Sequence, residues 1–163
     1  AEIAEGILPL HWPTKLLPQI RGQLNKAAEE AGRDSSEITL APFTRVFILN
    51  GNAGEDEVKW MEARNHVHHY VNRMGDFYWK MLTRSGFENE IASSRAAWAE
   101  RDREASLEAL SDEMIAGIQV IGPIEIVREH LAERARLGAD VQMLYMPPGE
   151  PSAVGRELEA LLS

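Results

Sequence analysis

Apolar runs alternate with amphipathic helical patterns along this sequence. The runs cover residues 3–10, 38–49 and 139–146. The second run, ITLAPFTRVFIL, is apolar on both alternating faces and rich in β-branched and aromatic residues. Strands of that kind are covered on both sides and belong to parallel sheets with helical connections. The pattern therefore predicts an α/β fold with parallel strands.

Helical patterns separate the three predicted strands. The first helix is predicted to begin near Leu17, because Pro18 is tolerated only in a first turn, with Thr14 as its cap and Gly32 as its stop. After the turn at residues 50–54, a long helical excursion is expected. It comprises a helix kinked at Gly75, a second helix over residues 88–110 and a short helix capped by Ser111. Gly122-Pro123 is predicted to open the helix before the last strand.

Three parallel strands make an incomplete sheet. Each outer strand would leave a row of unpaired backbone groups along an apolar edge, which favours aggregation. The pattern fits better in a larger sheet or in a closed barrel, which has no edges. We expect residues 3–10 to lie parallel beside residues 38–49, with the other edge bare or paired to a different chain.

Composition narrows the classes of partner. The 163-residue chain has the length of one domain and a formal net charge of -9, which argues against nucleic acid and anionic membrane surfaces as partners. It has no cysteine, which fits a reducing cytoplasm. No apolar stretch reaches the length of about 20 residues that spans a bilayer. A cytoplasmic protein is predicted.

Several segments resemble one enzyme family. AEIAEGILPL followed by AEEAGRDSSEITL, then YVNRMGDFYWKMLTRSGFENEI, then VIGPIEIVREHLAERARLGAD, resemble in this order the bacterial-luciferase-like flavin- and deazaflavin-dependent oxidoreductases. The branch is the one related to methylenetetrahydromethanopterin reductase. Glu5 stands where the family has Asp, and Gly122 stands where it has Thr, so the usual helix cap is missing.

The resemblance implies a (β/α)8 TIM barrel. Residues 1–163 would be the C-terminal part of a single such domain, with about the last three β/α units and the excursion before the final strand. The N-terminal strands would be missing, and the fragment alone would be inactive. It further implies FMN or an 8-hydroxy-5-deazaflavin coenzyme, with hydride transfer or oxygen activation (as in a monooxygenase) on an organic small molecule. The resemblance leaves open whether the protein forms a homodimer.

Candidate site residues follow the predicted strands, because barrel enzymes place their chemistry at the carboxyl ends. His11 and Trp12 are candidate cofactor residues, against the alternative that Trp12 packs under the loop and His11 is solvated. Arg45 lies in mid-strand and needs an acceptor, either a carboxylate from a missing strand or a cofactor phosphate. Candidate substrate residues at the other strand ends are Asn50, Tyr145 and Met146, and Asn52 follows the same argument.

Two further patterns are interpreted as structural. His66, His68 and His69 could include metal ligands, but no carboxylate lies at a recognisable spacing and HExxH is absent, so no metal is predicted. The GNAG turn precedes three acidic residues that would repel a phosphate. The alternative to the enzyme is a non-catalytic α/β interaction module that pairs with a partner chain.

Overall fold

The computed structural model describes residues 3–163, and its strands are all paired in parallel. They are β1 (Gly6–Ile7), β2 (Thr39–Leu40), β3 (Phe43–Ile48), β4 (Val120–Gly122) and β5 (Met143–Tyr145). β1 pairs with β2, whereas β3 pairs with β4 and with β5. The predicted α/β class with parallel strands is confirmed.

The first strand lies parallel beside the second, as predicted, but its ladder is short. It is limited to Gly6 and Ile7, followed by one isolated bridge from Leu10 to Phe43. Pro9 has no N–H to donate, and Pro42 interrupts the second strand between β2 and β3, so the pairing is discontinuous.

β2 and β3 together form the central strand, residues 39–48. One edge of this central strand is hydrogen-bonded to two different strands. The N–H groups of Ala41 and Phe43 donate to the carbonyls of Ile7 and Pro9, at 2.9 and 3.0 Å. Farther along, the Leu49 N–H donates to the Gly122 carbonyl at 2.8 Å. Alternate N–H groups of a strand point to the same edge. β1 and β4 therefore occupy successive parts of one edge, and β5 occupies the other.

β4 is a strand that the sequence pattern did not predict. Its residues lie between a short helix and Gly122-Pro123, and three residues are too few to show a strand period. All three are buried against β3. The next helix consequently begins at Ile124 and not at Gly122.

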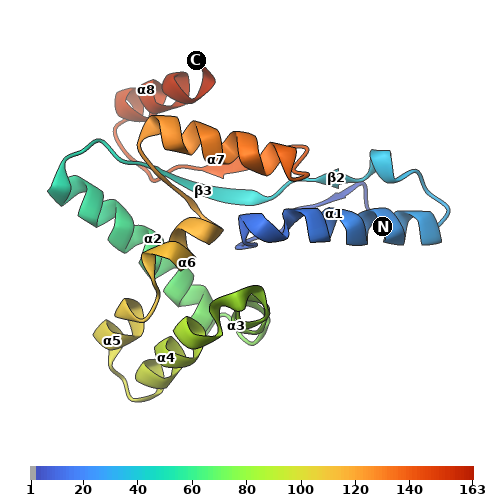
Figure 1. Cartoon of the computed structure of the whole chain (residues 1–163). Helices are drawn as coiled ribbons and strands as arrows, with labels where there is room; N and C mark the ends of the chain where they lie inside the picture. Colours follow the sequence, from blue (N-terminus) through green and yellow to red (C-terminus); the bar gives the residue numbers. More distant parts are fainter. Residues whose placement is uncertain (1–2) are drawn as a thin grey trace.

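The helices are as follows: η1 (Thr14–Leu16), α1 (Leu17–Glu30), η2 (Ser35–Glu37), α2 (Ala53–Arg73), α3 (Phe77–Leu82), the π-helical turn η3 (Thr83–Phe87), α4 (Glu88–Ala99), α5 (Arg103–Glu108), α6 (Asp112–Ile118), α7 (Ile124–Arg136) and α8 (Pro151–Leu162). α1 begins at Leu17 as predicted. Figure 1 shows α7 and α8 on one side of β3 and the helices of the excursion, α2–α6, on the other.

Local backbone chemistry divides the excursion more finely than the apolar pattern predicted. Gly75 has a φ of 69°, so it ends α2 instead of kinking one long helix. Arg101, with a φ of 63°, separates α4 from α5. The predicted cap at Ser111 is confirmed, because its Oγ accepts from the Met114 N–H at 3.1 Å. Thr14 makes no cap hydrogen bond, and its hydroxyl instead accepts from Arg134.

Three apolar clusters hold these elements together. On one face of β3, Val46 packs with Val120 and Val127 beneath α7 and α8. At its carboxyl end, Phe47 packs with the excursion. α1 covers β2 through a separate cluster that contains Leu40. Among residues 3–163, no helix is long and apolar enough to cross a membrane.

Arg21 joins α1 to the ends of two strands. Its guanidinium donates to the carbonyls of Ile38 and Gly138, each at 2.9 Å, and pairs with Asp140. The Asp140 carboxylate also accepts from the Leu40 N–H at 2.7 Å. One side chain therefore fixes the position of α1 relative to both β2 and β5.

We predict that Arg21→Ala lowers the free energy of unfolding by about 2 kcal/mol, because hydrogen bonds to a charged group are lost. Lys26→Ala is the control, since its 3.7 Å pair with Glu30 is exposed and should contribute well under about 1 kcal/mol. Urea denaturation measures both. Equal changes in the two variants would contradict the anchoring role of Arg21.

Candidate functional site

A cavity of about 410 Å³ lies on the face of the sheet that α7 and α8 leave free. It is lined by Leu8, Leu10, Phe43, Arg45, His66, Tyr70 and Tyr145. Phe43 and Arg45 alternate along β3 with Thr44 and Val46, so they point away from the cluster beneath α7. Tyr145 is the β5 residue paired with Arg45. Strand alternation and register thus bring these side chains to one face. We call this cavity the sheet-face cavity.

Arg45 connects the sheet to α2 at this cavity. Its guanidinium donates to His66 Nδ1 at 3.0 Å and to Glu62 Oε1 at 2.8 Å. The guanidinium carbon also lies 4.5 Å from the centre of the Tyr145 ring, within the range of a cation–π contact. Because a guanidinium only donates, His66 Nδ1 must be unprotonated, and the neutral ring carries its proton on Nε2.

His11 lies behind the wall of the cavity. Its side chain is only 3% exposed, and its φ of 60° is uncommon for a residue other than glycine. The ring centre lies 4.4 Å from that of Tyr70, 4.9 Å from that of His66 and 5.9 Å from that of Tyr78. These four rings, from the loop after β1 and from α2 and α3, form a buried imidazole–tyrosine cluster.

Both imidazoles of the cluster are held neutral. Burial, then His66, then the charge of Arg45 lower the pKa of His11 to about 3. Burial, then Arg45, then His69 lower the pKa of His66 to about 4. Both values are below the ordinary pKa of about 6.5. At neutral pH both rings are therefore uncharged, and each offers one N–H donor and one acceptor nitrogen.

Polar atoms of this cluster lack partners within the described chain. Arg45 Nε, His11 Nε2 and His66 Nε2 are buried without a hydrogen-bond partner. Buried polar groups in folded proteins are nearly always hydrogen-bonded, to protein or to ordered water. Ordered water or a polar group from outside residues 3–163 would satisfy these three atoms.

Comparison with known families identifies the chain's relatives. A model of the luciferase-like monooxygenase family matches residues 1–141. The chain belongs to the luciferase-like family. This agrees with the segments whose order in the sequence resembles that family.

One solved structure shares the fold of this luciferase-like chain. It is the coenzyme F420-dependent tetrahydromethanopterin reductase from Methanopyrus kandleri, with a TM-score of 0.68 and 20% sequence identity. The match covers 98% of this chain and 43% of the reductase chain, so this chain spans less than half the length of the reductase. The search of curated proteins gives no match.

The residues predicted from the sequence of this luciferase-like chain divide into two groups. Arg45 and Tyr145 line the sheet-face cavity, and His11 packs directly behind it. Trp12, Asn50 and Met146 lie elsewhere. Their predicted roles remain predictions.

Local contacts explain where the second group lies. Trp12 lines a separate cavity of about 350 Å³ beside α3. The amide of Asn50 is occupied within its loop, where Nδ2 donates to Glu55 at 2.6 Å and Oδ1 accepts from the Asn52 N–H at 2.9 Å. Met146 packs on the opposite face of the sheet with the Val46 cluster. Asn52 caps α2 by accepting from the N–H groups of Gly54 and Glu55.

Sequence reasoning missed the contribution of α2 to the sheet-face cavity. Glu62, His66 and Tyr70 are spaced four residues apart, which places them on one face of a helix. That spacing was the available signal. His68 faces the other way, where Nε2 lies 2.9 Å from Ser106 Oγ. Within residues 3–163, no group of three or more histidine or acidic residues could hold a metal ion.

The two neutral histidines predict sensitivity to acid. Below about pH 6.5 the unfolded chain takes up protons that folded His11 and His66 refuse until about pH 3 and 4. The free energy of unfolding should therefore fall as the pH falls from about 6.5 towards 4. Buried His11 contributes up to about 1.4 kcal/mol per pH unit, and half-buried His66 contributes less.

His11→Asn tests this dependence, because asparagine tolerates the positive φ but does not titrate in this range. Chemical denaturation at pH 7 and pH 5 should show a smaller loss of stability in His11→Asn than in the unsubstituted chain. His130→Gln on α7, outside the cluster, is the control and should keep the full loss. An unchanged pH dependence in His11→Asn would refute a neutral His11.

Proposed function

We propose that this chain is the C-terminal part of a flavin- or deazaflavin-dependent oxidoreductase that acts on an organic small molecule. The observation that carries the proposal is the luciferase-like family match over residues 1–141. On this proposal residues 1–163 form part of one (β/α)8 barrel domain, and preceding strands complete it. We call the completed molecule the full barrel and propose a cytoplasmic location for it.

The exposed face of the sheet supports a missing partner layer. Leu8, Met143 and Tyr145 are 59%, 42% and 38% exposed, although they lie on or beside a parallel sheet. Parallel sheets are ordinarily covered on both faces. Within the described part of the chain, β1 is paired only with β2, so its outer edge is available to another strand. The proposed N-terminal strands would use that edge and enclose the sheet-face cavity.

The residues of the cavity fit the ring of a flavin or deazaflavin. Leu8, Leu10 and Phe43 offer apolar and aromatic walls for a planar ring. Arg45 offers hydrogen-bond donors to ring carbonyl and nitrogen acceptors, because its contacts with His66 and Glu62 use only part of its five N–H groups. FMN and an 8-hydroxy-5-deazaflavin coenzyme share these features, so both remain candidates. The cofactor supplies the hydride or oxygen chemistry, as cofactors do.

The chain's own residues would bind and orient the cofactor and the substrate, and they would exclude water. Arg45 is held in place by Glu62 and His66, so its donors are fixed before a ligand arrives. His66 holds a proton on Nε2, and His11 fixes the rings of His66 and Tyr70 by packing against them. The proposed substrate residues remain Asn50, Tyr145 and Met146, of which Tyr145 lines this cavity. Trp12 remains a proposed cofactor residue.

The exposed apolar face also suits the alternative, a non-catalytic module that binds a partner chain. The two hypotheses differ in ligand binding. The module requires no affinity for flavins or deazaflavins, whereas the oxidoreductase requires it.

We predict that the full barrel binds reduced FMN or the reduced deazaflavin, and that Arg45→Gln weakens binding about tenfold or more by removing charge-assisted donors. Arg45→Lys keeps the charge but loses the planar fork, so it should restore only part of the affinity. Arg136→Gln, at the exposed end of α7, is the matched control and should bind normally.

Fluorescence titration with each cofactor under anaerobic conditions measures these affinities. Absence of binding of either cofactor to the unsubstituted full barrel would overturn the oxidoreductase. Binding that survives Arg45→Gln unchanged would keep the oxidoreductase but remove the sheet-face cavity as its cofactor site.

A further inference from the structure

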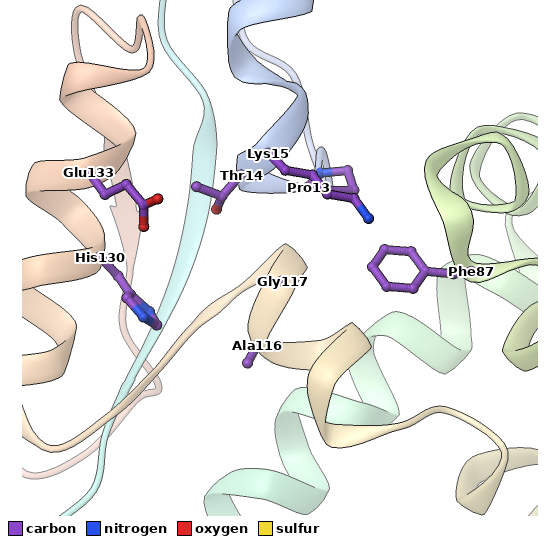
Figure 2. Close-up of a pocket in the computed structure, with 8 residues that line it drawn as sticks. All are labelled: Pro13, Thr14, Lys15, Phe87, Ala116, Gly117, His130 and Glu133. Atoms are coloured by element: carbon purple, nitrogen blue, oxygen red, sulfur yellow. The ribbon is translucent and has the colours of Figure 1, made fainter.

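A further cavity lies apart from the sheet-face cavity and shares none of its lining residues. It has a volume of about 320 Å³, and its walls come from η1, η3, α6 and α7 (Figure 2). It is lined by Pro13, Thr14, Lys15, Phe87, Ala116, Gly117, His130 and Glu133. We call it the α7 pocket. All of its walls belong to the described chain, so it needs no further strands to exist.

Two cations at the α7 pocket lack an acidic partner. Arg134 is 1% exposed, and it donates to Thr14 Oγ1, a lining atom, at 2.7 Å. Its Nε has no hydrogen-bond partner among the described residues. Burial lowers the pKa of Arg134 to about 10, so it remains charged at neutral pH. Neither Arg134 nor Lys15 forms an ion pair within residues 3–163.

This pairing is unusual for the chain. Its formal net charge is -9, so carboxylates are plentiful elsewhere, yet a buried guanidinium here has a hydroxyl as its partner. A buried charge without a counterion is costly unless something supplies one. The lining carboxylate, Glu133, is exposed on α7. A bound anion would supply the counterion that Arg134 lacks.

The polar groups of the pocket come from different elements. Lys15 is exposed, and its Nζ lies 4.9 Å from the centre of the Phe87 ring, so its ammonium group lies beside that wall of the pocket. Because Thr14 Oγ1 accepts from Arg134, its own proton is free to be donated. Figure 2 shows His130 reaching into the same space from α7. These groups suit the oxygens of a phosphate or carboxylate.

The remaining walls are apolar. Pro13, Phe87 and Ala116 are carbon surfaces, and Gly117 leaves room beside the Phe87 ring, where a Cβ would stand 3.6 Å from its Cζ. Such walls bind little of a bare inorganic ion but can bury the body of an organic one. We propose that the α7 pocket binds a small organic oxyanion with a compact apolar body, its charged group at Lys15 and the Thr14–Arg134 pair.

Calorimetric titration of the full barrel with phenyl phosphate, benzoate and inorganic phosphate tests the site. At least one of the two organic anions should bind, more tightly than inorganic phosphate and less tightly as salt is added. The stronger of the two shows whether phosphate esters or carboxylates are the natural class. Failure of both to bind at millimolar concentration overturns the proposal, as does tighter binding of inorganic phosphate.

Variants locate the binding. Lys15→Met keeps the aliphatic stem of an exposed side chain, and it should weaken the affinity for the organic anion about tenfold. Glu133→Gln should raise the affinity for the organic anion severalfold, because a repelling carboxylate is removed. Lys26→Met on α1, outside the pocket, should change the affinity for the organic anion by no more than about twofold. Equal effects of Lys15→Met and Lys26→Met would show general charge attraction and refute a site at the α7 pocket.

Discussion

The central strand, residues 39–48, is the constraint on which the rest of the structure depends. Each other strand of the described chain hydrogen-bonds to it or to the residue after it. β1 and β4 share one edge, and β5 takes the other. Since alternation along a strand fixes which side chains share a face, this one segment places Arg45 towards the free face and Val46 towards α7.

Arg45 then converts strand geometry into a site. Its guanidinium fixes the tautomer of His66, binds Glu62 and stacks on Tyr145, so a residue each from β5 and β3 and two from α2 are positioned together. Its charge also helps to hold His11 and His66 neutral. The result is a polar cluster within apolar walls that keeps unpartnered nitrogen atoms, which costs stability until a polar group meets them.

Patterns of local origin could be predicted from the sequence. The start of α1 at Leu17 and the Ser111 cap depend on short-range chemistry that the residues display directly. The parallel pairing of the first two strands could be predicted because a helical pattern connects them. The mid-strand position of Arg45 also indicated that a buried cation needs partners.

Features of tertiary origin could not be predicted in this way. β4 is a strand only because β3 offers an edge to three buried residues, and His66 joins the site only because α2 returns over the sheet. The break at Arg101 depends on a positive φ at a residue other than glycine, so no glycine in the sequence marks it.

The account's central claim is that the sheet-face cavity, walled by Arg45 and Tyr145, holds the cofactor ring of a luciferase-like oxidoreductase. A crystal structure of the full barrel with reduced FMN or deazaflavin bound tests it most directly. The account predicts the ring in this cavity, within hydrogen-bond distance of the Arg45 guanidinium and bordered by Tyr145. A ring bound elsewhere, with the Arg45 face filled by protein side chains, would contradict it.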